Sequence, residues 1–107
     1  MKIEWRSEKD REAVEKLALR NAVTERRMER IAAAKNFLDL QYPANGRAHF
    51  LQDQYEGYFA LDLESKTRPK RLICKPIGDF EKEGEQYVKE SITKFEIVKI
   101  EADYHKK

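Results

Sequence analysis

The spacing of apolar residues changes along this chain, from mainly helical in the first half to strand-like in the second. Ile3 and Trp5 alternate with charged neighbours, which predicts a short first strand. Ser7 followed by Asp10 fits the start of a capped helix. That helix places its apolar residues on one stripe, formed by Ala13, Val14, Leu17 and Ala18.

A second stretch of helical spacing follows, and Thr24 is placed to cap it. The stripe runs through Met28, Ile31, Ala32, the stem of Lys35 and Leu38, with Phe37 widening it. Pro43 and Asn45-Gly46 should end the helix and form a turn.

The second half of the chain predicts strands. The expected ranges are 47–52, 58–63, 70–75 and 95–102, separated by turns at 53–57, 64–69 and 76–78. Residues 79–92 are polar and have no clear period, so they read as a loop or a short helix.

This order of elements predicts an α+β fold in a single domain, residues 1–107. We expect a mainly antiparallel sheet of about five strands, in the order β-α-α-β-β-β-β, with two N-terminal helices packed on one face.

The charge of the chain is more informative in its distribution than in its sum. The net charge of +2 is too small to identify a nucleic-acid partner, although 39% of the residues are charged. Residues 66–75 contain five bases and no acid: Lys66, Arg68, Lys70, Arg71 and Lys75. Residues 79–90 contain five acids and two lysines, so a polarised surface is expected.

Cysteine and histidine usage limits the chemistry. Cys74 is the only cysteine and lies in a predicted strand, so we expect a buried thiol and neither a disulfide nor a metal cluster. Two histidines and no acid cluster at ligand spacing make a poor metal site, so no cofactor is expected. Residues 1–5 carry no apolar signal segment, and we expect a cytoplasmic protein with no membrane partner.

The last predicted strand leads into Asp103, Tyr104 and His105, three side chains suited to proton transfer or phosphate contact. His49 begins a different strand, and the basic stretch lies between them in sequence. These groups could meet at one site. Taken alone, His105 reads as a loose terminal histidine, and His49 is equally open to a structural and a catalytic role.

Four strings of sequence carry a resemblance to a known family. They are Arg47-Ala48-His49-Phe50-Leu51, Gly57-Tyr58-Phe59-Ala60-Leu61-Asp62-Leu63, Arg71-Leu72-Ile73-Cys74-Lys75, and residues 97–105, which end in Asp-Tyr-His. In this order and spacing the chain resembles the RelE/ParE superfamily of bacterial toxins, and most closely the HigB-like, plasmid-maintenance-killer branch of type II toxin–antitoxin systems. It departs from the family at Gln52-Asp53, where a lysine is common, and in a longer, more acidic segment 77–93.

The resemblance implies a RelE-like fold and a metal-independent endoribonuclease that cuts messenger RNA in the A site of the small ribosomal subunit. It implies a cognate antitoxin that silences the protein in a hetero-oligomer. It also assigns roles: His105 and His49 as acid and base, Tyr104 positioning the nucleotide, Asp103 orienting a histidine or acting as a base, and Arg71 binding the scissile phosphate. Lys75 and Arg68 would be supporting cations, with Lys70 adding long-range attraction to RNA.

Two other functions stay open at this point. A ParE-like protein would block DNA gyrase without nuclease chemistry, although the Asp-Tyr-His ending and His49 argue against it. A catalytically inactive member of the fold would only bind RNA or a partner protein.

Overall fold

A computed structural model describes residues 1–63 and 70–102. The strands are β1 (Lys2–Trp5), β2 (His49–Phe50), β3 (Phe59–Leu63), β4 (Lys70–Pro76), β5 (Lys82–Glu83), β6 (Gln86–Tyr87) and β7 (Lys94–Ala102). The α-helices are α1 (Glu8–Arg20), α2 (Ala22–Ala33) and α3 (Phe37–Leu40), with short 3-10 helices η1 (Pro43–Asn45), η2 (Asp53–Tyr55) and η3 (Lys89–Ser91).

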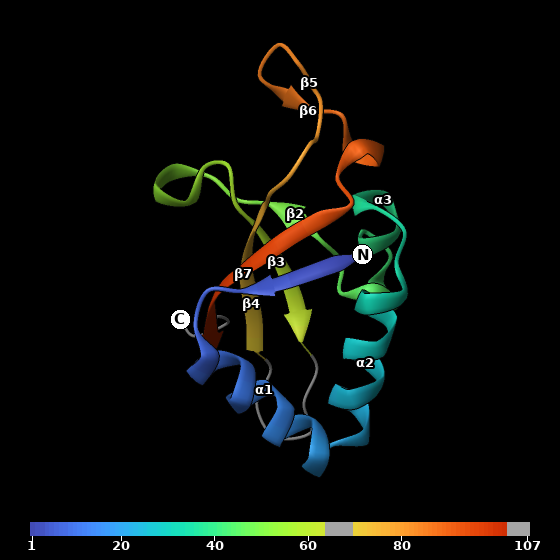
Figure 1. Ribbon diagram of the computed structural model, residues 1–107, viewed down its shortest axis with the longest axis vertical. Coiled ribbons are helices and arrows are strands. Elements are labelled where there is room, and N and C mark those ends of the chain that lie inside the picture. The colour runs from blue at the N-terminus through green and yellow to red at the C-terminus, as the bar shows by residue number, and fades with distance from the viewer. Residues whose placement is uncertain (64–69, 103–107) are drawn as a thin grey trace.

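Five strands form the main sheet, in the order β1-β7-β4-β3-β2 (Figure 1). β1 runs parallel to β7, and the other neighbours are antiparallel. The predicted α+β fold with a mainly antiparallel sheet of about five strands is therefore confirmed.

The core lies between one face of this sheet and the helices. Alternation along β3 turns Phe59, Leu61 and Leu63 towards the helices, and all three are fully buried. They pack with Ile31 of α2, with Phe37 of α3 and with Val14 of α1. The helices thus cover one face, as predicted. The other face carries polar side chains together with Ala60 and Ile73, which are also fully buried.

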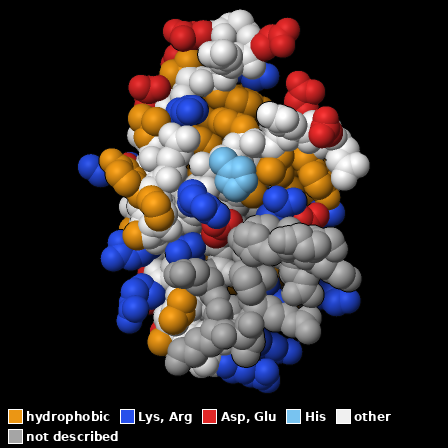
Figure 2. Space-filling model, turned by 180° about the vertical axis from the view of Figure 1, so that it is seen from behind, with side chains coloured by type: hydrophobic (Ala, Val, Ile, Leu, Met, Phe, Trp, Pro, Cys, Tyr) orange, Lys and Arg blue, Asp and Glu red, His pale blue; other side chains and the backbone are white. Residues whose placement is uncertain are grey.

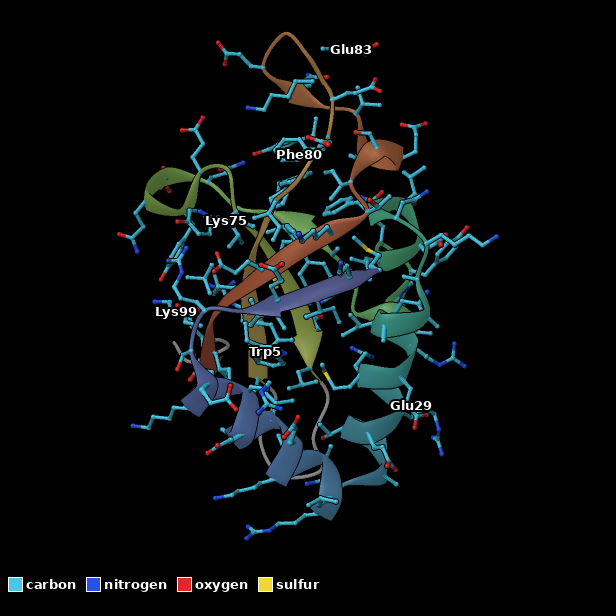
Figure 3. All side chains as sticks on the ribbon, viewed as in Figure 1. Trp5, Glu29, Lys75, Phe80, Glu83 and Lys99 are labelled. Carbon is cyan, nitrogen blue, oxygen red and sulfur yellow. The ribbon has the colours of Figure 1, made fainter. Side chains whose placement is uncertain are left out.

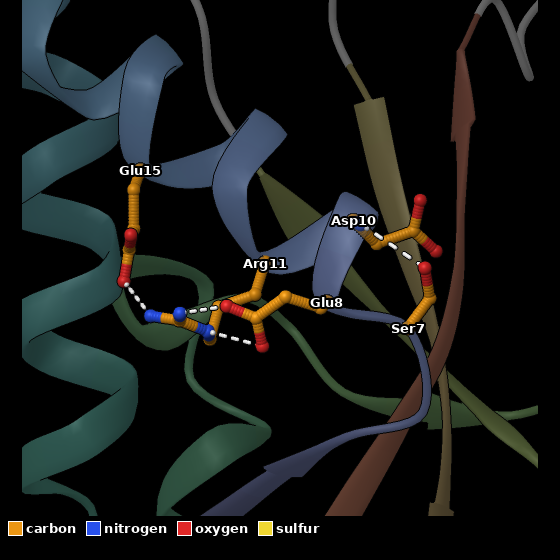
Figure 4. Close-up of polar contacts among 5 residues, drawn as sticks. All are labelled: Ser7, Glu8, Asp10, Arg11 and Glu15. Carbon is orange, nitrogen blue, oxygen red and sulfur yellow. Dashed lines mark hydrogen bonds and ion pairs between the residues drawn. The ribbon is translucent and has the colours of Figure 1, made fainter.

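Helix α1 begins where the sequence predicted. The Ser7 hydroxyl accepts a hydrogen bond from the Asp10 amide at 3.3 Å, which caps the first turn. Arg11 then pairs with Glu8 and, at 2.6 Å, with Glu15 on the exposed side of the helix (Figure 4). The charged pairs on this helix join residues that are close in sequence.

The prediction for the second helix was wrong at both ends. The observed helix α2 begins at Ala22 after Asn21, so Thr24 does not cap it but is fully buried inside its first turn. It ends at Ala33, and a separate helix starts at Phe37, where the Asn36 side chain accepts hydrogen bonds from Leu38 and Asp39. After the break, both Phe37 and Leu40 lie fully buried in the core.

The strand predicted at 47–52 is reduced to His49–Phe50. Arg47 and Asp53 adopt positive φ angles of 51° and 59°, which are incompatible with an extended strand. Gly46 also has a positive φ, and a Cβ atom there would meet Leu61 Cδ2 at 2.9 Å.

Residues 79–92 contain neither a plain loop nor an α-helix but a two-stranded hairpin, β5–β6, followed by η3. Figure 1 shows this hairpin projecting from the end of the molecule remote from α1. Its aromatic residue, Tyr87, is half-buried and packs against the core.

Two further expectations concern burial and membranes. Cys74 is fully buried as predicted, and burial raises the pKa of its thiol. Within residues 1–63 and 70–102, every helix falls short of the length and apolar character needed to cross a membrane.

Candidate functional site

The sheet face that turns away from the helices carries a row of charged residues. Strand register places Asp62 of β3 opposite Arg71 of β4, and Arg71 opposite Glu101 of β7. Opposed residues in antiparallel strands project on the same side of a sheet. The three side chains therefore lie in one line across the strands.

Glu101 is the centre of a cluster on this face. Its Oε1 accepts a hydrogen bond from Arg71 Nε at 2.8 Å. Its Oε2 accepts one from the Tyr55 hydroxyl at 3.1 Å and lies 3.4 Å from Lys99 Nζ. We refer to Tyr55, Arg71, Lys99 and Glu101 as the Glu101 cluster. It joins two strands and the η2 turn across long sequence separations.

The cluster fixes the charge of its carboxylate. Partial burial acts to raise the pKa of Glu101, but hydrogen bonds from Arg71 and Tyr55, together with the charge of Arg71, outweigh it, so this pKa lies below its usual value. The pKa of Lys99 is raised, chiefly by hydrogen bonding with Tyr55 and also by Glu101. Lys99 also lies 5.0 Å from the centroid of the Tyr55 ring. At neutral pH the cluster contains two cations and one anion.

A second ion pair lies beside the cluster. Arg47 contacts Asp62 Oδ2 through Nη2 at 2.6 Å and through Nε at 3.0 Å. The Asp62 carbonyl accepts a hydrogen bond from Arg27, which reaches it from α2. The Asp62 amide donates to the carbonyl of Gly46 at 2.7 Å. Asp62 therefore holds the turn that precedes His49.

His49 lies on the same face, at the edge strand β2. It pairs with Ala60, and Ala60 pairs with Ile73, two residues along β4 from Arg71. Strand geometry puts the Cα atoms of His49 and Arg71 roughly 12 Å apart. The His49 side chain is exposed, and its Nδ1 lies 3.1 Å from the Arg47 carbonyl oxygen. If Nδ1 donates that bond, Nε2 is left as the proton acceptor.

Lys75 lies on the same face as Arg71 but farther along β4, where it pairs with Glu96. Figure 3 shows Lys75 and Lys99 on the side of the sheet away from α2. Lys70, in contrast, neighbours Arg71 and therefore points to the opposite face. It lines a groove of about 410 Å³ beside α1, with Val14, Leu17 and Ile100.

The structure therefore brings Arg71, His49 and Lys75 to one face and puts Lys70 on the other. Asp103, Tyr104, His105 and Arg68 lie outside the described residues. By chain order, Asp103 follows Ala102, whose partner in the sheet is Lys70.

Sequence reasoning missed Tyr55, Lys99, Glu101 and the pair Arg47–Asp62. A signal was present, because pairing strands 58–63, 70–75 and 95–102 around Arg71 would have placed 62 and 101 beside it. Identifying these neighbours requires the exact register of the paired strands, however, and a β-bulge shifts the register of β4 against β7 between Ile73 and Cys74.

Among the described residues, no group of three or more His, Cys, Asp or Glu side chains is arranged to hold a metal ion. Comparisons of the chain with protein-family models, curated proteins and solved structures gave no match.

Proposed function

We propose that this protein is the toxin of a type II toxin–antitoxin module and acts as a ribosome-dependent messenger RNA endoribonuclease. The observation that carries the proposal is the row on the sheet face opposite the helices, where Arg71 lies two strands, and Lys99 three strands, from the exposed His49. The sequence resemblance to HigB-like toxins supports the same reaction and the same role for Arg71 in binding the scissile phosphate.

The reaction requires no group from outside the RNA and the protein. The ribose 2′-oxygen loses its proton and attacks the adjacent phosphorus. The bond from phosphorus to the 5′-oxygen breaks, which leaves a 2′,3′-cyclic phosphate and a 5′-hydroxyl. A protein catalyst must accept one proton, donate another and offset the charge on the phosphate oxygens.

Arg71 supplies the charge. Its guanidinium stays protonated and matches the geometry of phosphate oxygens. Glu101 holds Arg71 through Nε at 2.8 Å and so fixes the plane of the guanidinium. Lys99 adds a second cation within the cluster, and Lys75 extends the positive charge along β4.

His49 supplies one proton-transfer group. An Nδ1–H donated to the Arg47 carbonyl leaves Nε2 able to accept the 2′-hydroxyl proton. The roughly 12 Å between the Cα atoms of His49 and Arg71 leaves room for a nucleotide between the two side chains. His105 is proposed as the second proton-transfer group, with Tyr104 and Asp103 positioning RNA and histidine, and Arg68 as a supporting cation.

The proposed partners are messenger RNA on the ribosome and a cognate antitoxin. An antitoxin that pairs with Arg71 and Lys99 would remove the phosphate site without blocking folding, because the core lies on the other face. The proposed location is the cytoplasm, where translation takes place.

The test is primer-extension mapping of a messenger RNA in a purified translation system. The wild-type protein should cut only when ribosomes are present, and Arg71→Ala and His49→Ala should not cut. Arg26→Ala, which removes an exposed arginine from α2, is the matched control and should cut normally.

Other outcomes have defined meanings. Arrest of DNA supercoiling by purified gyrase, without RNA cuts, would replace the proposal with ParE-like inhibition. RNA binding that Arg71→Ala weakens, again without cuts, would identify an inactive member that only binds RNA.

A further inference from the structure

A groove of about 700 Å³ lies at the end of the molecule formed by the β5–β6 hairpin. One wall is the hairpin, and the other is the segment from β2 to Gly57. Its lining includes Phe50, Glu56, Gly57, Lys82, Glu85 and Tyr87. None of these residues belongs to the proposed catalytic row, so the groove is a separate surface.

The floor of the groove is the end of an aromatic stack that starts in the core. Phe37 stacks on Phe50 with centroids 4.6 Å apart and planes at 14°. Phe50 stacks on Tyr87 at 4.9 Å and 10°. The Tyr87 hydroxyl donates a hydrogen bond to the Gly57 carbonyl at 3.3 Å, which ties the ring across the groove. The Tyr87 ring is therefore fixed before any partner arrives.

The Tyr87 ring already holds a cation. Lys82, from the neighbouring hairpin strand, places its ammonium 4.8 Å from the ring centroid. Cations bind to aromatic faces in this way, and an exposed pair of this kind is weak enough to exchange. Lys82 thus shows which chemical group the ring accepts.

The surroundings of the ring are acidic. Residues 79–90, which form the hairpin side of the groove, carry five acids against two lysines. The lining itself contains Glu56 and Glu85 together with Lys82 and Lys89, so the acid excess lies in the residues around it. Figure 2 shows hydrophobic side chains gathered between acidic groups near this end of the molecule. Glu83 lies at the tip of the hairpin (Figure 3). Apolar surface surrounded by negative charge complements a segment that is both basic and apolar.

We infer that this groove binds a cationic peptide segment of a partner protein. An arginine or lysine of the partner replaces Lys82 on the Tyr87 ring. An apolar neighbour packs against the exposed part of Phe50, and flanking bases pair with Glu56 and Glu85. A nucleobase could also stack on Tyr87, but the excess of acids would repel its phosphates. The inference does not depend on the proposed nuclease activity.

Binding of a cationic peptide and binding of RNA should change in opposite directions when Lys82 is removed. Loss of Lys82 removes a competitor of a cationic peptide but removes an attractive charge for RNA. The probes are a fluorescent peptide of alternating arginine and leucine, its glutamate–leucine counterpart and a single-stranded RNA, each followed by fluorescence anisotropy. Wild-type protein should bind the arginine peptide and leave the glutamate peptide free.

Lys82→Ala should bind the arginine peptide about two- to fivefold more tightly, in line with one exposed cation–π contact. Glu85→Gln and Glu56→Gln should each weaken binding and reduce its dependence on salt. Glu29→Gln removes one exposed acid from α2, far from the groove in Figure 3, and should bind like wild type. Tyr87→Leu should bind more weakly than wild type.

Two results would overturn the inference. One is no binding of the arginine peptide by either wild type or Lys82→Ala. The other is weaker binding of RNA, but not of the peptide, in both Lys82→Ala and Tyr87→Leu. Messenger RNA cleavage by Lys82→Ala, measured in parallel, reports separately on the proposed function.

Discussion

Two arginine–carboxylate clusters in this protein are built in contrasting ways. On α1, Arg11 pairs with Glu8 and Glu15, three and four residues away along an exposed helix (Figure 4). In the Glu101 cluster, Arg71 pairs with a carboxylate from another strand, and their side chains are only 21% and 25% exposed. The first can be deduced from sequence spacing, and the second requires the assembled sheet.

The two clusters also differ in how strongly water screens their charges. An ion pair on an exposed helix is screened by water and contributes little to stability. A half-buried pair keeps its geometry, and its electrostatic interaction is stronger because the local dielectric is lower. One carboxylate in each cluster, Glu8 on α1 and Glu101 on β7, has a lowered pKa. For Glu8 the main cause is the hydrogen bond from Arg11, while for Glu101 the hydrogen bonds must overcome burial.

The largest expected difference between the two clusters is in messenger RNA cleavage. Arg71→Ala should reduce messenger RNA cleavage by about 10²–10³-fold, the usual loss when a transition-state charge partner is removed. Arg11→Ala should cleave at the wild-type rate. If circular dichroism shows that both proteins are folded and Arg71→Ala cleaves as fast as wild type, Arg71 is not part of the catalytic site.

The next effect concerns stability. Glu101→Gln removes the charge on which Arg71, Tyr55 and Lys99 converge, and should lower the free energy of unfolding by about 1 kcal/mol after allowance for solvent screening. Urea denaturation measures it. Glu15→Gln on α1 is the matched control and should unfold at the same urea concentration as wild type. Identical midpoints for Glu101→Gln and wild type would show that the Glu101 cluster contributes no net stability.

The pH dependence of this stability has a defined sign. Because the folded pKa of Glu101 lies below its ordinary value of 4.5, its contribution is complete above that pH and is lost as the pH falls through the folded pKa. The difference between wild type and Glu101→Gln should therefore be constant near pH 7 and shrink on acidification below about pH 4.5. Urea denaturation across a pH series measures it. A difference that grows on acidification would contradict the assigned pKa shift.

The smallest effect should come from the α1 cluster. Arg11→Ala removes two exposed pairs, so the melting temperature should change little, and high salt should abolish the change. Thermal denaturation at low and high salt tests this. A larger shift for Arg11→Ala than for Glu101→Gln would reverse the comparison.

Much of the fold could be predicted because its signals are local. Short apolar runs bounded by turn signals in 58–63, 70–75 and 95–102 identified the three central strands, and Ser7 identified the start of α1. The end of α2 was missed because Ala33 and Ala34 are both good helix residues. The break serves the burial of Phe37, which is a tertiary effect.

The candidate site was less predictable. Arg71 and His49 were identified through the family resemblance, but Glu101 and Tyr55 were not, since they contact each other across long sequence separations. The hairpin at 82–87 was missed because its strands are two residues each and carry charged side chains. Such short strands lack enough positions to show alternation.

The position of β7 in the sheet has a consequence for synthesis on the ribosome. β7 pairs with both β1 and β4, so β1 has no strand partner until Lys94 and the residues after it have been synthesised. At usual translation speeds the time between synthesis of Lys2 and of Lys94 is roughly 5–20 s. Arg71 likewise meets Glu101 and Lys99 only after β7 has been made. The nascent chain therefore contains Arg71 before either of its charged neighbours on β7 has been made.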